Sequence, residues 1–279
     1  MGVAYRSFGF RKKGIHNFKT IIGMKIYICD INKLKISDEY EHIISQLNSS
    51  LQKEINRFRQ RSGQLTALTR EILFSNVMQE QFYNKNPVID RNEFGKPFVS
   101  ALKNPDGSMC SEIEYQDFDF SITHSGNLTA IAFGTGSIGI DLEPLDRVND
   151  FKKLLRFFTE KEQNRMLNSA YPEREFFHVW TYREAFSKAE GTGLTLFEKY
   201  PVEIDYKNAR VSFQGKKYYF YEYIINTLNK FDSDVYTDYQ ITVCTLNNNE
   251  SIEPVIIDNT MWPQMLDRFL QRSASIAYK

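Results

Sequence analysis

Two acidic side chains, Asp141 and Glu143, are separated by one residue in the segment IGIDLE at 138–143. Alternate side chains of a β-strand leave the same face, so these carboxylates would lie side by side, with their Cα atoms about 6.5–7 Å apart. Hard oxygen ligands of this kind favour Mg²⁺, which takes a few protein carboxylates and completes its shell with water and phosphate. Because this spacing is common, the pair also fits an acidic edge strand in solvent.

A second group of chemically active side chains is expected on one helix. Trp180, Glu184 and Lys188 are spaced four residues apart and therefore lie along one stripe of a helix. Glu184 could add a third carboxylate to a metal site, and Lys188 could meet a phosphate oxygen as a point charge. The same spacing fits an exposed Glu–Lys pair that stabilises the helix by about 0.3–0.5 kcal/mol. The spacing alone leaves both interpretations open.

These side chains depend on elements that the hydrophobic pattern predicts. Strands are expected at 24–30, 118–123, 128–134, 138–142, 201–206, 209–213, 217–223 and 238–246. Helices are expected at 38–60, 63–83, 151–157, 160–169 and 173–189. The segment 91–110 is typical of a loop, with an Asn-Pro-Asp-Gly turn at 104–107.

The order strand, helices, strands occurs twice along the chain. This repetition predicts an α+β fold of two similar halves packed together. We expect an N-terminal half at 24–137 and a C-terminal half at 138–279, with the ligand site at their interface. Residues 1–23 carry basic but no acidic side chains and are expected to be a poorly ordered extension, or to precede a natural start at Met24.

The composition of the 279-residue chain narrows the class of protein. Acidic and basic residues number 35 each, so no net charge attracts nucleic acid or membrane. The sequence contains no run of about 18 apolar residues, so it predicts no transmembrane helix. Cys29, Cys110 and Cys244 are far apart and lack CxxC spacing, which is typical of free thiols in a reducing compartment. We therefore expect a globular cytoplasmic protein that binds neither nucleic acid nor membrane.

Three ordered segments resemble the signature blocks of 4′-phosphopantetheinyl transferases of the surfactin-synthetase-activating (Sfp) type. They are IGIDLE at 138–143, RFFTEKE at 156–162 and WTYREAFSKAEGTGL at 180–194. Two further blocks, FGKPFVS at 94–100 and SITHSG at 121–126, are similar to the family's GKP segment and N-I-S-H-S strand. The resemblance covers about residues 24–265. It implies a monomer whose halves are related by a pseudo-twofold arrangement, with the active site at their interface.

The resemblance also implies an activity and roles for individual residues. The family transfers 4′-phosphopantetheine from coenzyme A to a serine of an apo carrier protein and releases adenosine 3′,5′-bisphosphate, the holo-[acyl-carrier-protein] synthase reaction. The implied Mg²⁺ ligands are Asp141, Glu143 and Glu184. The implied catalytic residues are Glu162, as the general base, together with Lys188, as an acid or electrostatic clamp, and Glu184. The implied contacts to coenzyme A are Lys96, Thr123, His124 and Lys188. Glu162 is also three residues after Thr159, where it would form a capping box, so two roles compete for one carboxylate.

The chain departs from the family at Thr66, where an arginine usually meets coenzyme A. Arg59, Arg61 or Arg70 could replace that arginine. The implied partner is an acyl, peptidyl or aryl carrier protein, whose acidic helix would meet apolar and basic residues around 151–158. Two other functions remain. One is a degenerate relative that binds coenzyme A or a carrier without turnover, and the other is a different Mg²⁺-dependent phosphotransferase or phosphohydrolase.

Overall fold

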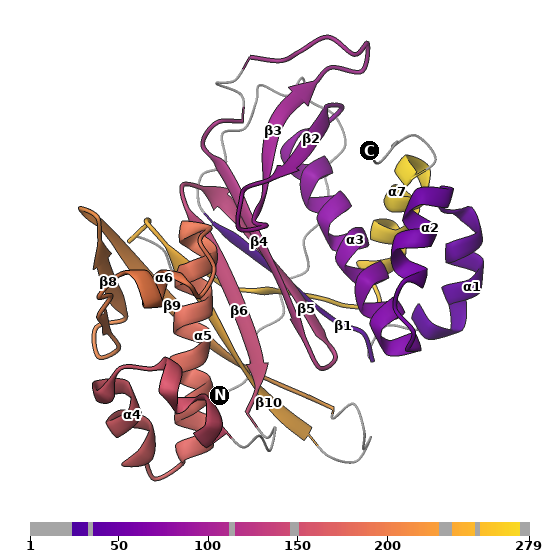
Figure 1. Cartoon of the computed structure of the whole chain (residues 1–279). Helices are drawn as coiled ribbons and strands as arrows, with labels where there is room; N and C mark the ends of the chain where they lie inside the picture. Colours follow the sequence, from indigo (N-terminus) through magenta and orange to yellow (C-terminus); the bar gives the residue numbers. More distant parts are fainter. Residues whose placement is uncertain are drawn as a thin grey trace.

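Two β-sheets form the centre of the structure, a computed structural model that describes residues 24–32, 36–111, 115–145, 151–228, 236–248 and 252–273 (Figure 1). The first sheet has the order β11 (Val255–Ile257), β1 (Lys25–Asp30), β5 (Leu128–Thr135), β4 (Phe118–Ser125). The second has the order β6 (Ile138–Pro144), β10 (Tyr236–Thr245), β9 (Lys216–Leu228), β8 (Arg210–Phe213), β7 (Ile204–Asp205). β2 (Asn86–Arg91) and β3 (Pro97–Lys103) form a separate hairpin. The expected extension at 1–23 lies outside the described residues.

Helices cover the outer face of each sheet (Figure 1). The first sheet packs against α1 (Ile36–Gln46), α2 (Ser49–Asn56), α3 (Arg61–Gln81) and α7 (Trp262–Ser273). The second half adds a 3₁₀ helix, η2 (Phe151–Phe157), and α4 (Glu160–Leu167), α5 (Pro172–Glu190) and α6 (Leu196–Lys199). The α+β fold class is therefore confirmed.

The alternating pattern of strand side chains explains how the two sheets share one core. In β1, Ile26 and Ile28 face the second sheet, whereas Cys29 faces the helices on the other side. In β6, Ile138, Ile140 and their alternate neighbours join the same intersheet cluster. Apolar alternation thus buries one face of each sheet against the other. All three cysteines are free, as the sequence predicts.

Several elements differ from the sequence prediction. The expected helix at 38–60 is two helices, because Asn48 caps α2 by accepting the N–H of Leu51 at 2.9 Å. The expected loop at 91–110 contains strand β3, and the segment at 151–157 is a 3₁₀ helix. Residues 255–273, which we assigned to the C-terminal half, pair with β1 and pack on α3.

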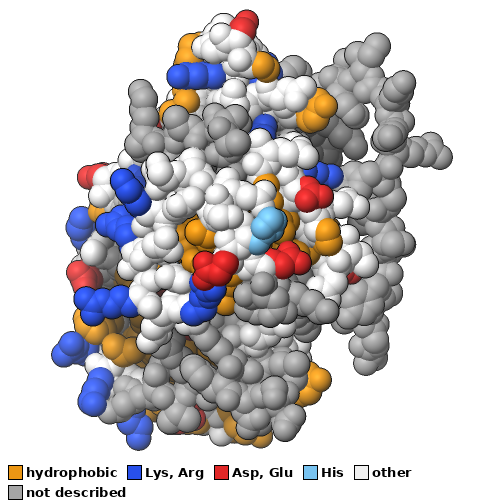
Figure 2. Space-filling model, turned by 90° about the vertical axis from the view of Figure 1, so that its right-hand side faces the viewer, with side chains coloured by type: hydrophobic (Ala, Val, Ile, Leu, Met, Phe, Trp, Pro, Cys, Tyr) orange, Lys and Arg blue, Asp and Glu red, His pale blue; other side chains and the backbone are white. Residues whose placement is uncertain are grey.

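The exposed surface agrees with a zero net charge. On the face shown in Figure 2, acidic side chains lie among basic and polar ones, and the hydrophobic side chains described there form small groups. Within the described part of the chain, no helix has both the length and the apolar character needed to cross a membrane.

β4 and β6, the edge strands of the two sheets, meet through side chains of β4. The Asp119 carboxylate accepts the backbone N–H of Ile138 at 2.8 Å. Two residues on, the Ser121 hydroxyl accepts the N–H of Ile140 at 3.1 Å. An edge strand whose backbone donors were buried without partners would be destabilised. Polar side chains on one face of β4 therefore join the two halves.

Gly139 brings α5 unusually close to β6. A Cβ atom at Gly139 would lie 1.9 Å from the backbone oxygen of Ala185 and 2.5 Å from the nitrogen of Ala189. Only glycine allows this approach, because both neighbours are backbone atoms of a helix. Thr181 of α5 also shares a 2.8 Å hydrogen bond with Thr242 of β10, and both hydroxyls are buried. The helix is therefore held directly on the strand that carries Asp141 and Glu143.

A partly exposed ionic network joins α4, α5 and β9. The His178 ring lies 3.3 Å from Glu175 and 2.7 Å from Glu222, and Arg165 also pairs with Glu175. Burial lowers the pKa of His178, but the hydrogen bonds and charges of Glu175 and Glu222 outweigh it and raise the pKa to about 9. The imidazolium ion therefore persists near neutral pH and links the helices to the sheet.

We expect Gly139→Ala to reduce the free energy of unfolding by about 3 kcal/mol, because the added methyl group must push α5 away from β6. Urea unfolding followed by circular dichroism measures this loss. Gly63→Ala is the control, since its new methyl group meets the side chain of the exposed Phe58, and alanine is favoured over glycine in a helix by about 1 kcal/mol. Equal stabilities for Gly139→Ala and the native chain would contradict the packing argument.

We also expect a pH-dependent contribution from His178. Its folded-state pKa is raised from 6.5 to about 9, so the stabilisation is complete below pH 6.5 and is lost as the pH rises through 9. The stability difference between the native chain and His178→Gln should shrink by about 2–3 kcal/mol between pH 6 and pH 10. Urea unfolding at a series of pH values tests this, with His42→Gln on an exposed face of α1 as control. A difference that does not change with pH would refute the charged network.

Candidate active site

Asp141, Lys188 and Thr123 meet where β6, α5 and β4 come together. The ammonium of Lys188 donates to Oδ1 of Asp141 at 2.6 Å and to the hydroxyl of Thr123 at 3.3 Å. The same hydroxyl donates to Oδ1 of Asp141 at 3.1 Å. Oδ2 of Asp141 is buried and has no hydrogen-bond partner among the described residues. Such an orphaned carboxylate oxygen calls for an explanation, and a cation is its natural partner.

The two other predicted metal ligands lie on the same pair of elements. Glu143 is half-buried on β6 and accepts the hydroxyl hydrogen of Ser125 at 2.8 Å. Glu184 is one helical turn before Lys188 on α5. Burial raises the pKa of Glu184, Lys188 lowers it, and the like charge of Asp141 raises it. The negative charge of Asp141 therefore acts on the Glu184 carboxylate across the contact between α5 and β6.

The three carboxylates fit Mg²⁺ in kind but do not converge as a finished metal site. Within the described residues, no three acidic, histidine or cysteine side chains are grouped closely enough to hold a metal ion. The positive charge beside Asp141 comes from the ammonium of Lys188. The donors are nevertheless all hard oxygens, which Mg²⁺ prefers, and the orphaned Oδ2 of Asp141 offers a lone pair.

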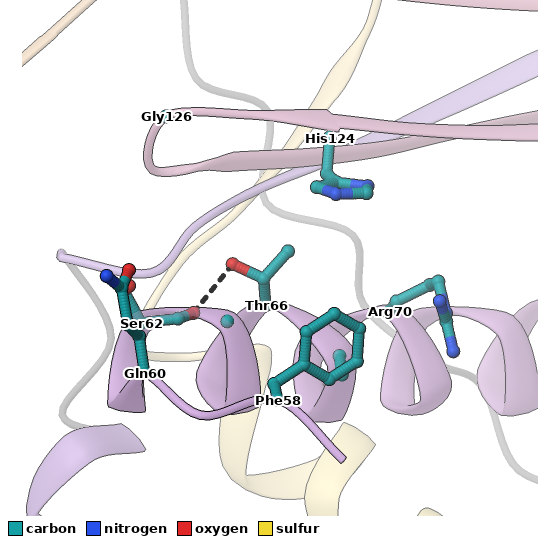
Figure 3. A pocket seen from close by; sticks show the side chains of 9 residues that line it. Phe58, Gln60, Ser62, Thr66, Arg70, His124 and Gly126 are labelled. Atoms are coloured by element: carbon teal, nitrogen blue, oxygen red, sulfur yellow. Dashed lines mark hydrogen bonds between the residues drawn. The ribbon is translucent and has the colours of Figure 1, made fainter. Parts of the chain in front are cut away.

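A cavity of about 220 Å³ opens between α3 and the β4–β5 hairpin (Figure 3). The His124 ring points from β4 toward α3, where Thr66 and Arg70 stand one turn apart. Burial lowers the pKa of His124, and the positive charges of Arg70 and Lys188 lower it further. His124 follows Thr123 directly, so one strand borders both the cavity and the carboxylate cluster. The remaining lining residues are Phe58, Gln60, Ser62, Gly63, Ala67 and Gly126.

Among the described residues that line this cavity, Arg70 is the cation. Thr66, where the resemblance implies an arginine, donates its hydroxyl hydrogen to the carbonyl of Ser62 at 2.9 Å. Arg70 is held by Glu71 at 2.8 Å and by Glu54 at 3.2 Å. Of the three arginines considered from the sequence, Arg70 is the one that lines the cavity.

Glu162 is buried at the start of α4, and both of its oxygens are engaged. Oε2 accepts the backbone N–H and the hydroxyl of Thr159, each at 2.9 Å, which completes the predicted capping box. Oε1 accepts the hydroxyl hydrogen of Tyr206 at 2.6 Å. Arg183 lies 3.8 Å from Oε2. Glu162 therefore has structural partners that any role as a base must share.

Lys96, which the resemblance places at the nucleotide, has protein acceptors around its ammonium. It donates to Asp119 at 2.6 Å and to the carbonyls of Ile138 and Ala189 at 3.2 and 3.3 Å. The three donors of a lysine are thereby matched by three acceptors. The predicted contact of Lys96 with coenzyme A stays a prediction.

Sequence reasoning missed several supporting side chains. Asp119, Ser121 and Ser125 join β4 to β6, and Tyr206 binds Glu162. The alternating polar residues of FDFSITHS at 118–125 were an available signal for the first three. Alternate side chains of a strand leave the same face, so these polar side chains are expected to meet the same neighbouring element. Tyr206 left no such signal, since its partner is 44 residues away.

Comparisons with known proteins agree with this geometry. A family model described as the 4′-phosphopantetheinyl transferase superfamily matches residues 137–244, and one described as 4′-phosphopantetheinyl transferase, N-terminal, matches residues 35–135. The 4′-phosphopantetheinyl transferase ffp of Bacillus subtilis is 27% identical over 68% of this chain and 80% of its own length. The 4′-phosphopantetheinyl transferase Sfp of Bacillus subtilis (strain 168) is 28% identical over 62% of this chain and 73% of its own length.

A third relative matches a shorter part of the chain. The 4′-phosphopantetheinyl transferase HetI of Nostoc is 37% identical over 30% of this chain and 38% of its own length. The two family models meet at residues 135–137, where β5 ends and β6 begins. Between them they cover β4 and β5 of the first sheet, nearly all of the second sheet, and the cluster of Asp141 and Lys188, whereas β1 and β11 lie outside both matches. The chain belongs to the 4′-phosphopantetheinyl transferase superfamily.

Proposed function

We propose that the chain is a Mg²⁺-dependent enzyme that transfers 4′-phosphopantetheine from coenzyme A to a serine of an apo carrier protein. The observation that carries this proposal is the cluster of Asp141, Lys188 and Thr123 beside the cavity that His124 and Arg70 line. It offers carboxylates for a cation and basic groups for phosphates in one continuous region. Family membership supports the same activity.

The proposed reaction is a displacement at phosphorus. The carrier serine oxygen forms a bond to the phosphorus that bears pantetheine. The bond from that phosphorus to the bridging oxygen of the pyrophosphate breaks, and adenosine 3′,5′-bisphosphate leaves with the bonding electrons. The proton of the serine hydroxyl passes to a base of the enzyme. Positioning and electrostatic stabilisation account for most of the catalysis in reactions of this type.

Asp141, Glu143 and Glu184 would hold the magnesium ion. When bound, Mg²⁺ neutralises the pyrophosphate and the charge that develops on the leaving group. Lys188 now balances Asp141, and its ammonium would bind a phosphate oxygen of coenzyme A. Thr123 would keep the Asp141 carboxylate oriented through its 3.1 Å hydrogen bond.

Glu162 is the proposed base, under a constraint from its partners. Its carboxylate oxygens already accept hydrogen bonds from Thr159 and Tyr206, so the lone pairs that would take up the serine proton are engaged. To accept the serine proton, Glu162 would give up one of these hydrogen bonds. Tyr206 is the candidate, since its release leaves the cap of α4 intact.

The cavity is the proposed site for the nucleotide of coenzyme A. His124 and Arg70 line it and would bind phosphate oxygens through N–H donors, and a guanidinium can do so with two parallel hydrogen bonds. The carboxylates of Glu54 and Glu71 hold Arg70 in place. Arg70 would therefore supply the positive charge that the family's arginine supplies one helical turn earlier.

The carrier would dock on η2 near α5. Lys152, Lys153 and Arg156 are exposed on this element, and the Arg156 guanidinium lies 4.8 Å from the ring centre of Phe157, which is half-exposed. Basic side chains around an exposed aromatic ring suit an acidic helix with an apolar anchor. We further propose that the protein is a monomer and that it acts in the cytoplasm. The cytoplasm is a reducing compartment, in which the three free thiols would stay reduced.

We expect the native chain to add phosphopantetheine to an apo peptidyl or acyl carrier domain when coenzyme A and Mg²⁺ are present. Glu184→Gln should lower the transfer rate about 100-fold or more, because it removes a charged group from the cluster around the reacting phosphates. Intact-protein mass spectrometry of the carrier measures the transfer. Glu173→Gln, an exposed position in the first turn of the same helix, should leave the rate unchanged.

Two outcomes would decide against this proposal. No transfer by the native chain to any of several carriers, combined with tight binding of coenzyme A, would favour a binding protein without turnover. Release of inorganic phosphate from simple phosphate esters, without transfer to any carrier, would favour a phosphohydrolase.

We expect Arg70→Met to raise KM for coenzyme A roughly tenfold, because a charge-assisted hydrogen bond to phosphate is worth about 1.5–3 kcal/mol. The increase should be smaller with dephospho-coenzyme A if Arg70 binds the 3′-phosphate. Steady-state kinetics with both substrates distinguishes the cases. Arg59→Met, at an exposed position outside the cavity lining, is the matched control. Equal KM values for Arg70→Met and the native chain would remove Arg70 from the site.

A further inference from the structure

We propose that Lys96 is a positioning residue that fixes the end of α5 against the start of β6 and thereby sets the spacing of Lys188 and Asp141. Lys96 lies in the turn between β2 and β3 and therefore belongs to neither α5 nor β6. The inference rests on the proposed function, because the consequence of misplacing Lys188 is read in the transfer reaction.

The ammonium of Lys96 bridges three elements. It donates to Asp119 on β4, to the carbonyl of Ile138 at the start of β6, and to the carbonyl of Ala189 near the end of α5. Its side chain is only 16% exposed and that of Asp119 only 17%. Burial raises the pKa of Asp119, and the Lys96 ammonium opposes that effect. A buried carboxylate of this kind needs a fixed cationic partner, so the lysine is held in one place.

The turn that carries Lys96 is itself docked on the helix end. The Asn92 side chain accepts the backbone N–H of Lys96 at 2.9 Å and donates to the carbonyl of Gly191 at 2.7 Å. Gly191 is the C-cap of α5 and has φ +71°, a conformation that favours glycine. A Cβ atom there would lie 2.9 Å from the Asn92 amide and 3.1 Å from Lys96. The hairpin and the helix end therefore fit closely.

This joint lies next to the reacting groups along both elements. Ala189 follows Lys188 directly on α5, and Ile138 is three residues before Asp141 on β6. Gly139, which lies between Ile138 and Asp141 on β6, makes the close contact with the backbone of α5. A shift of α5 along β6 would change the 2.6 Å contact of Lys188 with Asp141. A displacement of about 1 Å in a positioned group can lower a rate by about 100-fold.

Lys96→Met tests the inference, because methionine keeps the apolar stem and removes the donors. We expect kcat for transfer to fall roughly tenfold or more while KM for coenzyme A changes by less than about twofold. The backbone N–H groups of Gly191 and Thr192, which both bond to the carbonyl of Ser187, should exchange faster with deuterium. Lys103→Met, at the exposed far end of β3, is the control and should match the native chain.

A second variant separates positioning from simple stability. Lys96→Met leaves the Asp119 carboxylate buried without its cation, which destabilises the fold. In Lys96→Met combined with Asp119→Asn that charge is gone, and the amide oxygen can still accept the N–H of Ile138. We expect the double variant to regain thermal stability but to keep the low kcat, because nothing restores the bond to Ala189.

Each alternative result overturns the inference in a distinct way. A raised KM for coenzyme A with unchanged kcat would make Lys96 a nucleotide contact. Recovery of kcat in the double variant would reduce its role to neutralising Asp119. Absence of transfer by the native chain would refute the proposed function but would leave the structural role of Lys96 standing. Unchanged amide exchange at Gly191 and Thr192 in Lys96→Met would refute that structural role.

Discussion

The direct contact of α5 with β6 is the constraint on which the rest of the site depends. Gly139 has no side chain, so the helix backbone at Ala185 and Ala189 lies against the strand where any Cβ atom would overlap it. Glu184 and Lys188 are on the same stretch of α5, and Asp141 is two residues beyond Gly139 on β6. Acidic and basic groups 47 residues apart along the chain are thereby brought to hydrogen-bonding distance. The chemistry of the cluster follows from a packing contact rather than from a loop.

The seam between β4 and β6 extends this constraint to the first half of the chain. The side chains of one face of β4 reach first the backbone of β6 and then its carboxylates. Thr123 belongs to this face, and the adjacent His124 projects into the cavity toward α3. Movement of β4 would therefore disturb the carboxylate cluster and the cavity together. Coupling of this kind requires both halves in one fold, because β4 belongs to one sheet and β6 to the other.

Several charged groups here serve the fold and the chemistry at once. Glu162 caps α4 and binds Tyr206, and the Arg165 guanidinium lies 4.9 Å from the ring centre of that tyrosine. Arg165 in turn joins the network of His178, so the proposed base is supported by a chain of polar contacts that runs from the interior to the surface. Such support restricts the rotamers of the carboxylate, which favours a defined geometry.

Local periodicity determined much of this protein. The helices at α3 and α5, the strands around 118–144, and the shared face of Asp141 and Glu143 follow from spacings of two and 3.6 residues, and the motifs identify the superfamily. The tertiary structure alone decided which distant segments meet. It returned β11 and α7 to the first half, placed Arg70 rather than Arg59 or Arg61 at the cavity, and surrounded Lys96 with acceptors from β4, β6 and α5. The physical reason is that periodicity reports which face of an element is buried, whereas the partner of that face depends on packing between residues far apart along the chain.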